Sequence, residues 1–319
     1  MSGHIPVLVI YGPTASGKSA AALAAALEFG GTVINADSMQ LYADLPILSA
    51  APSAAEMALA PHRLYGVLDA AEAASAQRWR EMVVPEIRAA HAKGSLPIVV
   101  GGTGLYLKAL LEGLSSIPEV PADIRAAVRA RMAEQGPQAM HALLAARDPV
   151  TAAGLRPSDP QRISRALEVL EATGRPLAEW QGLPPDGPPP GMRFRVAVIA
   201  PPRAHVYARC DRRLELMVEQ GALEEVGQLG ARSLDPALPA MKALGVPDFL
   251  AHLRGESDLK SALAAAQKST RHYAKRQFVW VNHHFITDFF LSEQFSEKER
   301  TNFFAFIRES GLTQRTQGH

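Results

Sequence analysis

Short apolar runs bounded by turn residues recur along the chain and have the length of buried strands. The expected strands are Val7–Tyr11, Thr32–Asn35, Pro97–Val100 and Phe194–Ile199, with a shorter one at Phe285–Thr287. The first three runs lead into a turn and then a helical pattern, which is the β-α-β order of an open parallel sheet. The pattern therefore predicts an α/β domain whose parallel sheet is flanked by helices.

A long stretch without strand patterns separates the third and fourth runs. Residues 122–146 and 159–173 are rich in Ala, Arg, Leu and Glu and predict helices, and the proline-rich segment Pro184–Pro190 ends any helix. We interpret this stretch as a helical insertion. The expected division is an α/β core at 1–117 and 193–290 with helices near 205–230 and 258–280, the insertion at 118–192, and a C-terminal helix and tail at 291–319.

Composition narrows the class of protein. Of the 319 residues, 47% are hydrophobic and 20% are charged, which is typical of globular proteins. Cys210 is the only cysteine, so the chain forms neither an internal disulfide nor a cysteine-based zinc module. The run Val7–Tyr11 is too short to cross a bilayer, and no coiled-coil heptads occur in the sequence. We therefore expect a cytoplasmic monomer without a membrane partner.

Charge is spread unevenly, although the net charge is only +1. Residues 121–280 contain 22 Lys and Arg against 17 Asp and Glu, whereas residues 1–120 contain 7 against 10. A basic middle region is compatible with a polyanionic partner. It is equally compatible with an uneven surface that has no such partner, so charge alone leaves both interpretations open.

The most specific motif matches G-x-x-x-x-G-K-[ST] and lies between a predicted strand and a predicted helix. It comprises Gly12, Pro13, Thr14, Ala15, Ser16, Gly17, Lys18 and Ser19. Its glycines let the backbone N–H groups turn inward, and the following helix contributes its positive end. Lys18 adds a charge, and the Ser19 hydroxyl is suited to bind Mg²⁺. The motif predicts a polyphosphate site but does not specify which polyphosphate binds.

Four further polar motifs follow in order. They are Asp37–Tyr42 (DSMQLY), Gly101–Tyr106 (GGTGLY), Asp159–Glu168 (DPQRISRALE) and Tyr273–Gln277 (YAKRQ). Together with the phosphate loop, they resemble the tRNA dimethylallyltransferase (isopentenyltransferase) family over most of residues 7–282. The resemblance implies a P-loop NTPase-like sheet with a helical insertion that contacts the tRNA anticodon stem-loop. It implies transfer of a dimethylallyl group from dimethylallyl diphosphate to N6 of adenosine 37, with Mg²⁺ as cofactor.

The resemblance gives three residues catalytic roles. Asp37 follows the second strand, at the edge where α/β sheets bind ligands, and would accept the N6 proton. Its alternative roles are a helix cap or a water-mediated Mg²⁺ contact. Thr103 would contact the bridging oxygen of the leaving diphosphate, or else satisfy its own backbone. Arg213 would clamp the diphosphate; it lies four residues from Arg209 on one helix face, where arginines are often only solvated.

The resemblance also implies contacts with tRNA. Arg162 and Arg165 are spaced to lie on one side of a helix and would contact phosphates, although pairing with Glu168 is an alternative. The expected tRNA contacts are Asp37, Ser38, Met39, Gln40, Thr103, Arg125, Gln161, Arg162, Ile163, Ser164 and Arg165.

Four positions depart from the family pattern without removing a proposed catalytic group. Where the family usually has Lys-Pro, His-His, Gly-Tyr and Thr-Trp pairs, this chain has Ala51-Pro52, His62-Arg63, Gly245-Val246 and Val279-Trp280. Three rival functions are less well supported, because the helical insertion, the QRISR and AKRQ segments and Asp37 would not all be needed for any of them. They are prenylation of a free adenine nucleotide, a small-molecule P-loop kinase, and a nucleotide-gated RNA-binding module without chemistry.

Overall fold

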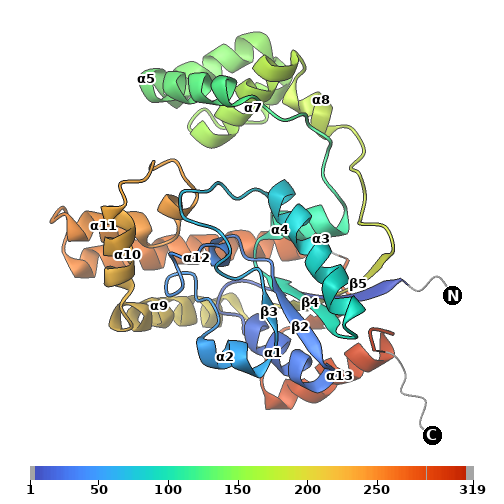
Figure 1. Ribbon diagram of the computed structural model, residues 1–319. Helices are drawn as coiled ribbons and strands as arrows, with labels where there is room; N and C mark the ends of the chain where they lie inside the picture. Colours follow the sequence, from blue (N-terminus) through green and yellow to red (C-terminus); the bar gives the residue numbers. More distant parts are fainter. Residues whose placement is uncertain (1–3, 285, 314–319) are drawn as a thin grey trace, which may run out of the picture. The chain divides into compact units, whose positions relative to one another are not determined.

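The computed structural model describes residues 4–284 and 286–313. The chain forms two compact units, one of Met1–Leu111 with Pro188–His319 and one of Glu112–Gly187 (Figure 1). The second unit thus begins before residue 118 and ends before residue 192, the limits expected from the sequence. Its two ends are joined by hydrogen bonds, because Leu114 N–H donates to Asp186 Oδ1 at 2.9 Å and Asp186 N–H donates to Leu114 O at 3.2 Å.

A six-stranded sheet in the order β3-β2-β4-β1-β5-β6 forms the centre of the first unit, and every strand pair is parallel. The strands are β1 Ile5–Tyr11, β2 Gly31–Asn35, β3 His62–Arg63, β4 Leu96–Gly101, β5 Met192–Ile199 and β6 Phe289–Leu291. The four longest strands contain the four long predicted runs. The predicted α/β class with a parallel sheet flanked by helices is therefore confirmed.

The two edge strands differ from the prediction. The strand expected at Phe285–Thr287 is β6, which begins only at Phe289; Phe285 itself lies outside the described residues. Asp288 sets this register, because its N–H donates to Val196 O at 2.9 Å and its carboxylate accepts Val196 N–H at 2.7 Å. The two-residue strand β3 was not predicted, since His62 and Arg63 have no apolar pattern.

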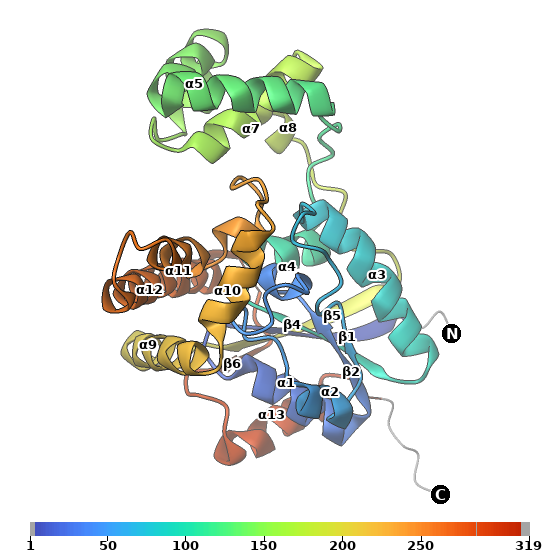
Figure 2. The same ribbon diagram turned by 60° about the vertical axis from the view of Figure 1, so that its left-hand side comes forward.

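Helices cover both faces of the sheet (Figure 2). One face packs against α1 (Lys18–Phe29) and α13 (Glu297–Glu309), whose Phe303 and Ile307 are fully buried in the same core as Leu8 and Ile10. The helix expected as part of a separate C-terminal segment therefore belongs to the core of the first unit. Helix α3 (Ala76–Ala92) packs on strands β1, β2 and β4. Helix α4 (Gly104–Leu111) packs against α3 and against α12 (Leu259–His284), which in turn packs against α9 (Arg203–Glu219).

The helix expected near 205–230 is two helices. Gly221, with φ 104°, is in the left-handed region and separates α9 from α10 (Ala222–Ala231). This geometry favours glycine, so the break is encoded in the sequence. The short helix α11 (Val246–Leu253) was not predicted, and α12 continues to His284. Among the described residues, no helix has both the length and the apolar character that a membrane span requires.

The second unit is helical. Its helices are α5 Ala122–Arg147, α6 Pro149–Ala153, α7 Pro160–Thr173 and α8 Leu177–Gln181. Their apolar faces share one core that includes Val128, Leu144 and Ile163. Asp159 caps α7 by accepting the N–H of Arg162 at 3.0 Å. The start of α7 therefore presents the predicted QRISR segment on its first two turns.

Candidate active site

Three loops that carry predicted site residues follow neighbouring strands. The phosphate loop follows β1, the Asp37 turn follows β2, and the Thr103 turn follows β4, which lies between them in the sheet. The carboxyl ends of parallel strands share one edge, where α/β proteins bind ligands. Ser38 N–H donates to Thr103 Oγ1 at 3.0 Å, which joins the second loop directly to the third.

The phosphate loop is tightly curled. Ala15 and Gly17 have positive φ angles of 61° and 94°, and Ser16 N–H donates to Pro13 O at 3.2 Å. A Cβ on Gly12 would lie 2.4 Å from Ile199 O, so only glycine fits where β1 ends. The loop opens directly into α1, which begins at Lys18. The N–H groups and positive end of that helix are therefore presented to the loop.

Two cations lie at the phosphate loop. Lys18 Nζ donates to Pro13 O at 3.3 Å, and the Arg213 guanidinium donates to Thr14 Oγ1, so neither of these partners is a carboxylate. Burial lowers the pKa of Lys18 to about 8, against the opposing effect of the Asp37 charge. Burial likewise lowers the pKa of Arg213. The site is therefore suited to an anion that would compensate both charges.

The second arginine of that helix face has a different environment. Arg209 is exposed and donates to Gln294 Oε1. Of the two arginines spaced four apart on α9, the structure brings only Arg213 to Thr14 of the phosphate loop.

Oxygen donors at the loop fit a magnesium ion that is held mainly by phosphate. Ser19 is exposed in the first turn of α1, and the Ser16 hydroxyl is fully buried without a hydrogen-bond partner within the described part of the chain. The described residues contain no group of three or more His, Cys, Asp or Glu side chains placed to bind a metal. Mg²⁺ commonly takes few protein ligands and completes its shell with phosphate oxygens and water.

The Asp37 turn is held by the side chain of Asn35. Asp37 N–H donates to Asn35 Oδ1 at 2.7 Å, and Asn35 Nδ2 donates to Asp37 O and to Leu64 O, both at 2.9 Å. Asn35 is fully buried, so these bonds are shielded from water. Asp37 Oδ1 also accepts Met39 N–H at 3.0 Å, a contact within the turn itself. The half-buried carboxylate is thereby fixed in orientation at the edge of the sheet.

Thr103 is fixed against the same turn. Besides accepting Ser38 N–H, its hydroxyl donates to Ser38 Oγ at 3.3 Å. A Cβ on Gly101 would lie 2.1 Å from Ala36 O, so the β4 and β2 turns approach as closely as glycine permits. Burial and the Asp37 charge raise the pKa of Tyr273, which also has Thr103 as a hydrogen-bond partner.

Gln277 is a site residue to which sequence reasoning gave no role. Its side chain, on α12, is 2% exposed. Its Oε1 accepts Thr14 N–H at 2.8 Å, and its Nε2 donates to Gly102 O at 2.7 Å. One amide thus bridges the phosphate loop and the Thr103 turn. The sequence carried a signal, because Gln277 shares a helical face with the apolar residues Ala274 and Phe278, where a polar side chain needs a partner.

The predicted tRNA contacts differ in accessibility. Gln161 and Arg162 are exposed, and Ser164 and Arg165 are half-buried on α7. Ile163 is fully buried in the core of the second unit, so its side chain is not available to RNA. The helical period turns every third or fourth side chain inward, so the side chains of this segment that face solvent are those of Gln161, Arg162, Ser164 and Arg165, and contact of the segment with tRNA stays a prediction.

The arginines of the second unit are paired to different degrees. Arg162 lies 3.6 Å from Asp159, and Arg165 lies 4.0 Å from Glu168, which Arg129 also approaches at 3.9 Å. Arg125 lies 3.8 Å from Glu119. These long contacts leave the guanidinium groups able to bind phosphate.

Residues 40–284 match the model of the family described as IPP transferase. The chain belongs to the IPP transferase family. A tRNA dimethylallyltransferase of Rhodospirillum centenum is 58% identical over 278 residues, which cover 87% of this chain and 88% of the relative. The family resemblance inferred from the motifs is thus confirmed.

Solved structures of the family share this fold. The full-length tRNA isopentenylpyrophosphate transferase of Bacillus halodurans is 30% identical with a TM-score of 0.68, covering 96% of each chain. A eukaryotic dimethylallyltransferase acting on tRNA is 26% identical with a TM-score of 0.77, covering 98% of this chain and 81% of that one. This member of the IPP transferase family therefore has the P-loop NTPase-like architecture that the sequence predicts.

We expect diphosphate binding to weaken as the pH rises through about 8, the pKa of Lys18. Its folded-state pKa lies below its ordinary value, so the ammonium form that attracts an anion is lost above that pH. Affinity should fall by up to about tenfold per pH unit there. Calorimetry with inorganic diphosphate measures this. Lys18→Ala, titrated in parallel, corrects for ionisation of diphosphate, and exposed Lys93→Ala is the control. An identical pH dependence in wild type and Lys18→Ala would contradict a role of the Lys18 ammonium group in binding diphosphate.

Gln277→Glu should weaken both the fold and the diphosphate site. The carboxylate keeps an acceptor for Thr14 N–H but cannot donate to Gly102 O. A buried carbonyl left unpaired costs about 1–3 kcal/mol of unfolding free energy. The added negative charge should also raise the Kd for diphosphate by about tenfold, equivalent to about 1.4 kcal/mol. Urea unfolding and calorimetry measure the two effects, with exposed Gln228→Glu as control. Wild-type values for both would show that the amide bridge is not needed.

Proposed function

We propose that this chain transfers a dimethylallyl group from dimethylallyl diphosphate to N6 of the adenosine at position 37 of tRNA, 3′ of the anticodon, and releases diphosphate. The observation that carries the proposal is the juxtaposition at one sheet edge of an anion site and a carboxylate. The anion site contains Lys18 and Arg213, and the carboxylate is Asp37. Family membership supports it, because relatives at 50% identity and above are named tRNA dimethylallyltransferase.

On the donor side, the loop N–H groups, Lys18 and Arg213 bind the diphosphate. Negative charge grows on the bridging oxygen as the allylic C–O bond breaks, and donors aimed at that oxygen stabilise the transition state. Thr103 supplies such a donor when its hydroxyl proton turns from Ser38 Oγ to the substrate. A bound Mg²⁺, with Ser19 as its protein ligand, supplies further neutralisation of the diphosphate charge.

On the acceptor side, Asp37 activates a weak nucleophile. The N6 lone pair of adenine is delocalised into the ring, so loss of the N–H proton must accompany attack. The N6–C bond forms, the C–O bond of the donor breaks with its electron pair on diphosphate, and the proton goes to the Asp37 carboxylate. Moving a base out of its stack costs a few kcal/mol and less in a loop than in a duplex. An anticodon-loop adenosine is therefore an accessible substrate.

We assign phosphate contacts of the anticodon stem-loop to Arg125, Arg162 and Arg165 of the second unit. Arginine contacts with phosphates position RNA, whereas the splayed base undergoes the chemistry. We further propose that the enzyme acts as a cytoplasmic monomer, consistent with a single buried cysteine and a sequence without coiled-coil heptads.

A labelling experiment separates this function from its alternatives. The protein is incubated with allyl-labelled dimethylallyl diphosphate or γ-phosphate-labelled ATP, each with tRNA or free AMP. We expect only the allyl label to enter only tRNA. Label in AMP would indicate a nucleotide prenyltransferase, transfer of the γ-phosphate would indicate a kinase, and tRNA binding without any label would indicate a binding module. Each of these three results would overturn the proposal.

Asp37→Asn should keep tRNA binding and lose most turnover. The amide preserves size and the contact with Met39 N–H but cannot accept the N6 proton. Loss of a general base costs about 10²–10⁴-fold in rate. Single-turnover kinetics with saturating tRNA measure this, and exposed Asp123→Asn is the control. A decrease smaller than tenfold would mean that Asp37 is not the base.

Replacing Arg162 and Arg165 together with Ala should weaken tRNA binding and leave diphosphate binding intact. Each lost single-strand phosphate contact reduces the slope of log K against log salt by about 0.7, so the pair should flatten it by about 1–1.5. The control is Arg131→Ala with Arg147→Ala, because these side chains are engaged by Glu171 at 2.6 and 3.0 Å. Filter binding at several salt concentrations measures the slope. Equal slopes in wild type and the Arg162/Arg165 variant argue for a purely structural helix.

A further inference from the structure

The chain that follows the proposed base folds into a closed loop around one side chain. Gln40 Nε2 donates to Ser49 O at 3.0 Å and to Ala50 O at 2.8 Å. Ala51 N–H donates to Pro46 O at 3.0 Å, which closes the loop at its ends. The amide nitrogen of Gln40, a predicted tRNA contact, therefore has an internal role. We call Pro46–Ala51 the acceptor loop.

A buried carboxylate on α10 holds the acceptor loop. Glu225 is 8% exposed, and its two oxygens accept the consecutive backbone N–H groups of Ile47 at 2.7 Å and Leu48 at 2.9 Å. Burial raises the pKa of Glu225 by more than these two N–H donors lower it. Burying a carboxylate is unfavourable unless it is fully hydrogen-bonded. Its pairing with a surface loop instead of another helix indicates that the loop must keep a defined shape.

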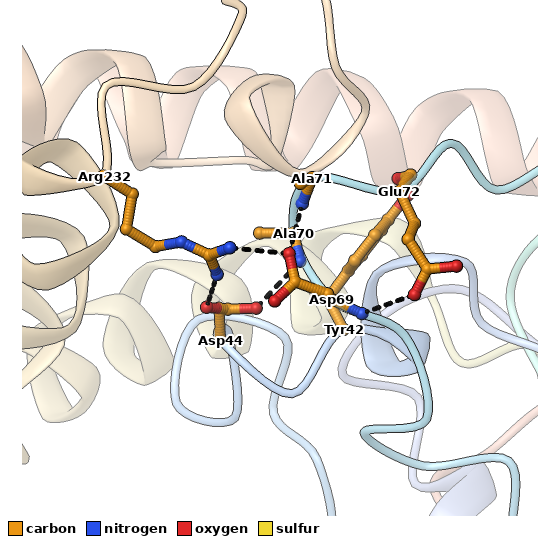
Figure 3. A network of polar contacts seen from close by, with 7 residues as sticks. All are labelled: Tyr42, Asp44, Asp69, Ala70, Ala71, Glu72 and Arg232. Atoms are coloured by element: carbon orange, nitrogen blue, oxygen red, sulfur yellow. Dashed lines mark hydrogen bonds and ion pairs between the residues drawn. The ribbon is translucent and has the colours of Figure 1, made fainter.

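An arginine at the other end of α10 holds the chain that leads into the acceptor loop (Figure 3). Arg232 donates to Asp44 Oδ1 and, at 2.6 Å, to Asp69 Oδ1. Asp44 Oδ2 accepts Ala70 N–H at 2.9 Å, and Ala43 N–H donates to Leu68 O at 3.0 Å. The Arg232 guanidinium therefore binds both the segment at Asp44 and the segment at Asp69, which are also hydrogen-bonded to each other.

Further hydrogen bonds hold the segment around Asp69 and connect it to Tyr42. Figure 3 shows Asp69 Oδ1 turned toward Ala71 N–H, its donor at 2.7 Å, and Glu72 Oε1 accepting Asp69 N–H at 3.1 Å. Tyr42 is anchored in the same region, because its hydroxyl donates to Glu72 O at 3.1 Å. The contacts of Arg232 are thus linked through Tyr42 to the Asp37–Tyr42 segment.

We propose that Glu225 and Arg232 are positioning residues that hold the acceptor loop and its approach in the shape that receives tRNA. The two side chains are seven residues apart on one helix, about 10 Å along its axis. The helix therefore acts as a rigid template with two fixed points. The diphosphate-binding groups belong to other elements, the phosphate loop and α9. This inference rests on the proposed function, since it concerns how the acceptor is bound.

The test compares Glu225→Gln and Arg232→Gln with wild type. Glutamine at 225 retains the size of the side chain but sets an NH₂ group against a backbone N–H. We expect the Kd for tRNA to rise about tenfold in each variant, equivalent to about 1.4 kcal/mol. The Kd for inorganic diphosphate should stay within about twofold, equivalent to about 0.4 kcal/mol. Hydrogen exchange should accelerate at the Ile47 and Leu48 amides in Glu225→Gln.

One matched control lies on α10 itself and the other at the end of the following helix, α11. Exposed Glu224→Gln neighbours Glu225, and Arg254→Gln replaces an arginine that ends α11 as Arg232 ends α10. Both should bind tRNA like wild type. Arg232→Lys keeps the charge and one of the two contacts, so it should recover part of the affinity that Arg232→Gln loses.

A merely structural role predicts a different result, with lower thermal stability and unchanged tRNA affinity in Glu225→Gln and Arg232→Gln. That outcome overturns the inference. Equal loss of diphosphate and tRNA affinity also overturns it, because the clamp would then act on the whole site. Failure of the proposed function is distinguishable, since wild-type protein itself would transfer no allyl group to tRNA.

Discussion

A single buried amide sets the geometry on which the proposed site depends. Gln277 accepts an N–H from the phosphate loop and donates to a carbonyl of the Thr103 turn, and both contacts lie within 2.8 Å. An uncharged amide offers both a donor and an acceptor at the end of one side chain. Tyr11 holds the backbone of the same residue, with its hydroxyl 3.0 Å from Gln277 O. The loops after β1 and β4 are therefore connected to each other through α12 as well as through the sheet.

Around this bridge, protein groups hold the Asp37 and Thr103 turns, whereas the two cations contact neutral groups. Asn35 holds the Asp37 turn, and Ser38 holds the Thr103 hydroxyl. Lys18 and Arg213 instead contact a carbonyl and a hydroxyl, and burial disfavours their charged forms. An arriving diphosphate would restore favourable surroundings for both. Preorganised donors of this kind need no rearrangement as charge develops in a transition state.

Local sequence patterns predict much of the fold. Alternation of apolar runs and turns located the four long strands, and the spacing of glycine and lysine located the phosphate loop, because both depend on neighbours in sequence. The break at Gly221 was visible as a glycine but not as a helix end. The packing of α13 on α1 was missed, since its aromatic residues meet partners almost the whole chain away.

At the site, too, local motifs were predictable and long-range contacts were not. Motifs placed the phosphate loop, Asp37 and Thr103 after successive predicted strands, and the sheet order brings the three turns to one edge. The role of Gln277 required knowing that a residue on α12 reaches loops more than 170 positions earlier. The clamp formed by Glu225 and Arg232 depends likewise on pairs separated by well over 100 residues. Sequence spacing within one motif does not report such pairs.

Mass spectrometry of nucleosides tests the central claim most directly. Transfer RNA is incubated with the protein and dimethylallyl diphosphate, digested, and its nucleosides are identified while released diphosphate is counted. We expect N6-dimethylallyladenosine at position 37, one diphosphate released for each modified nucleoside, and no product when that adenosine is replaced by guanosine. Modification at another atom or position, or diphosphate release without a modified nucleoside, would contradict it.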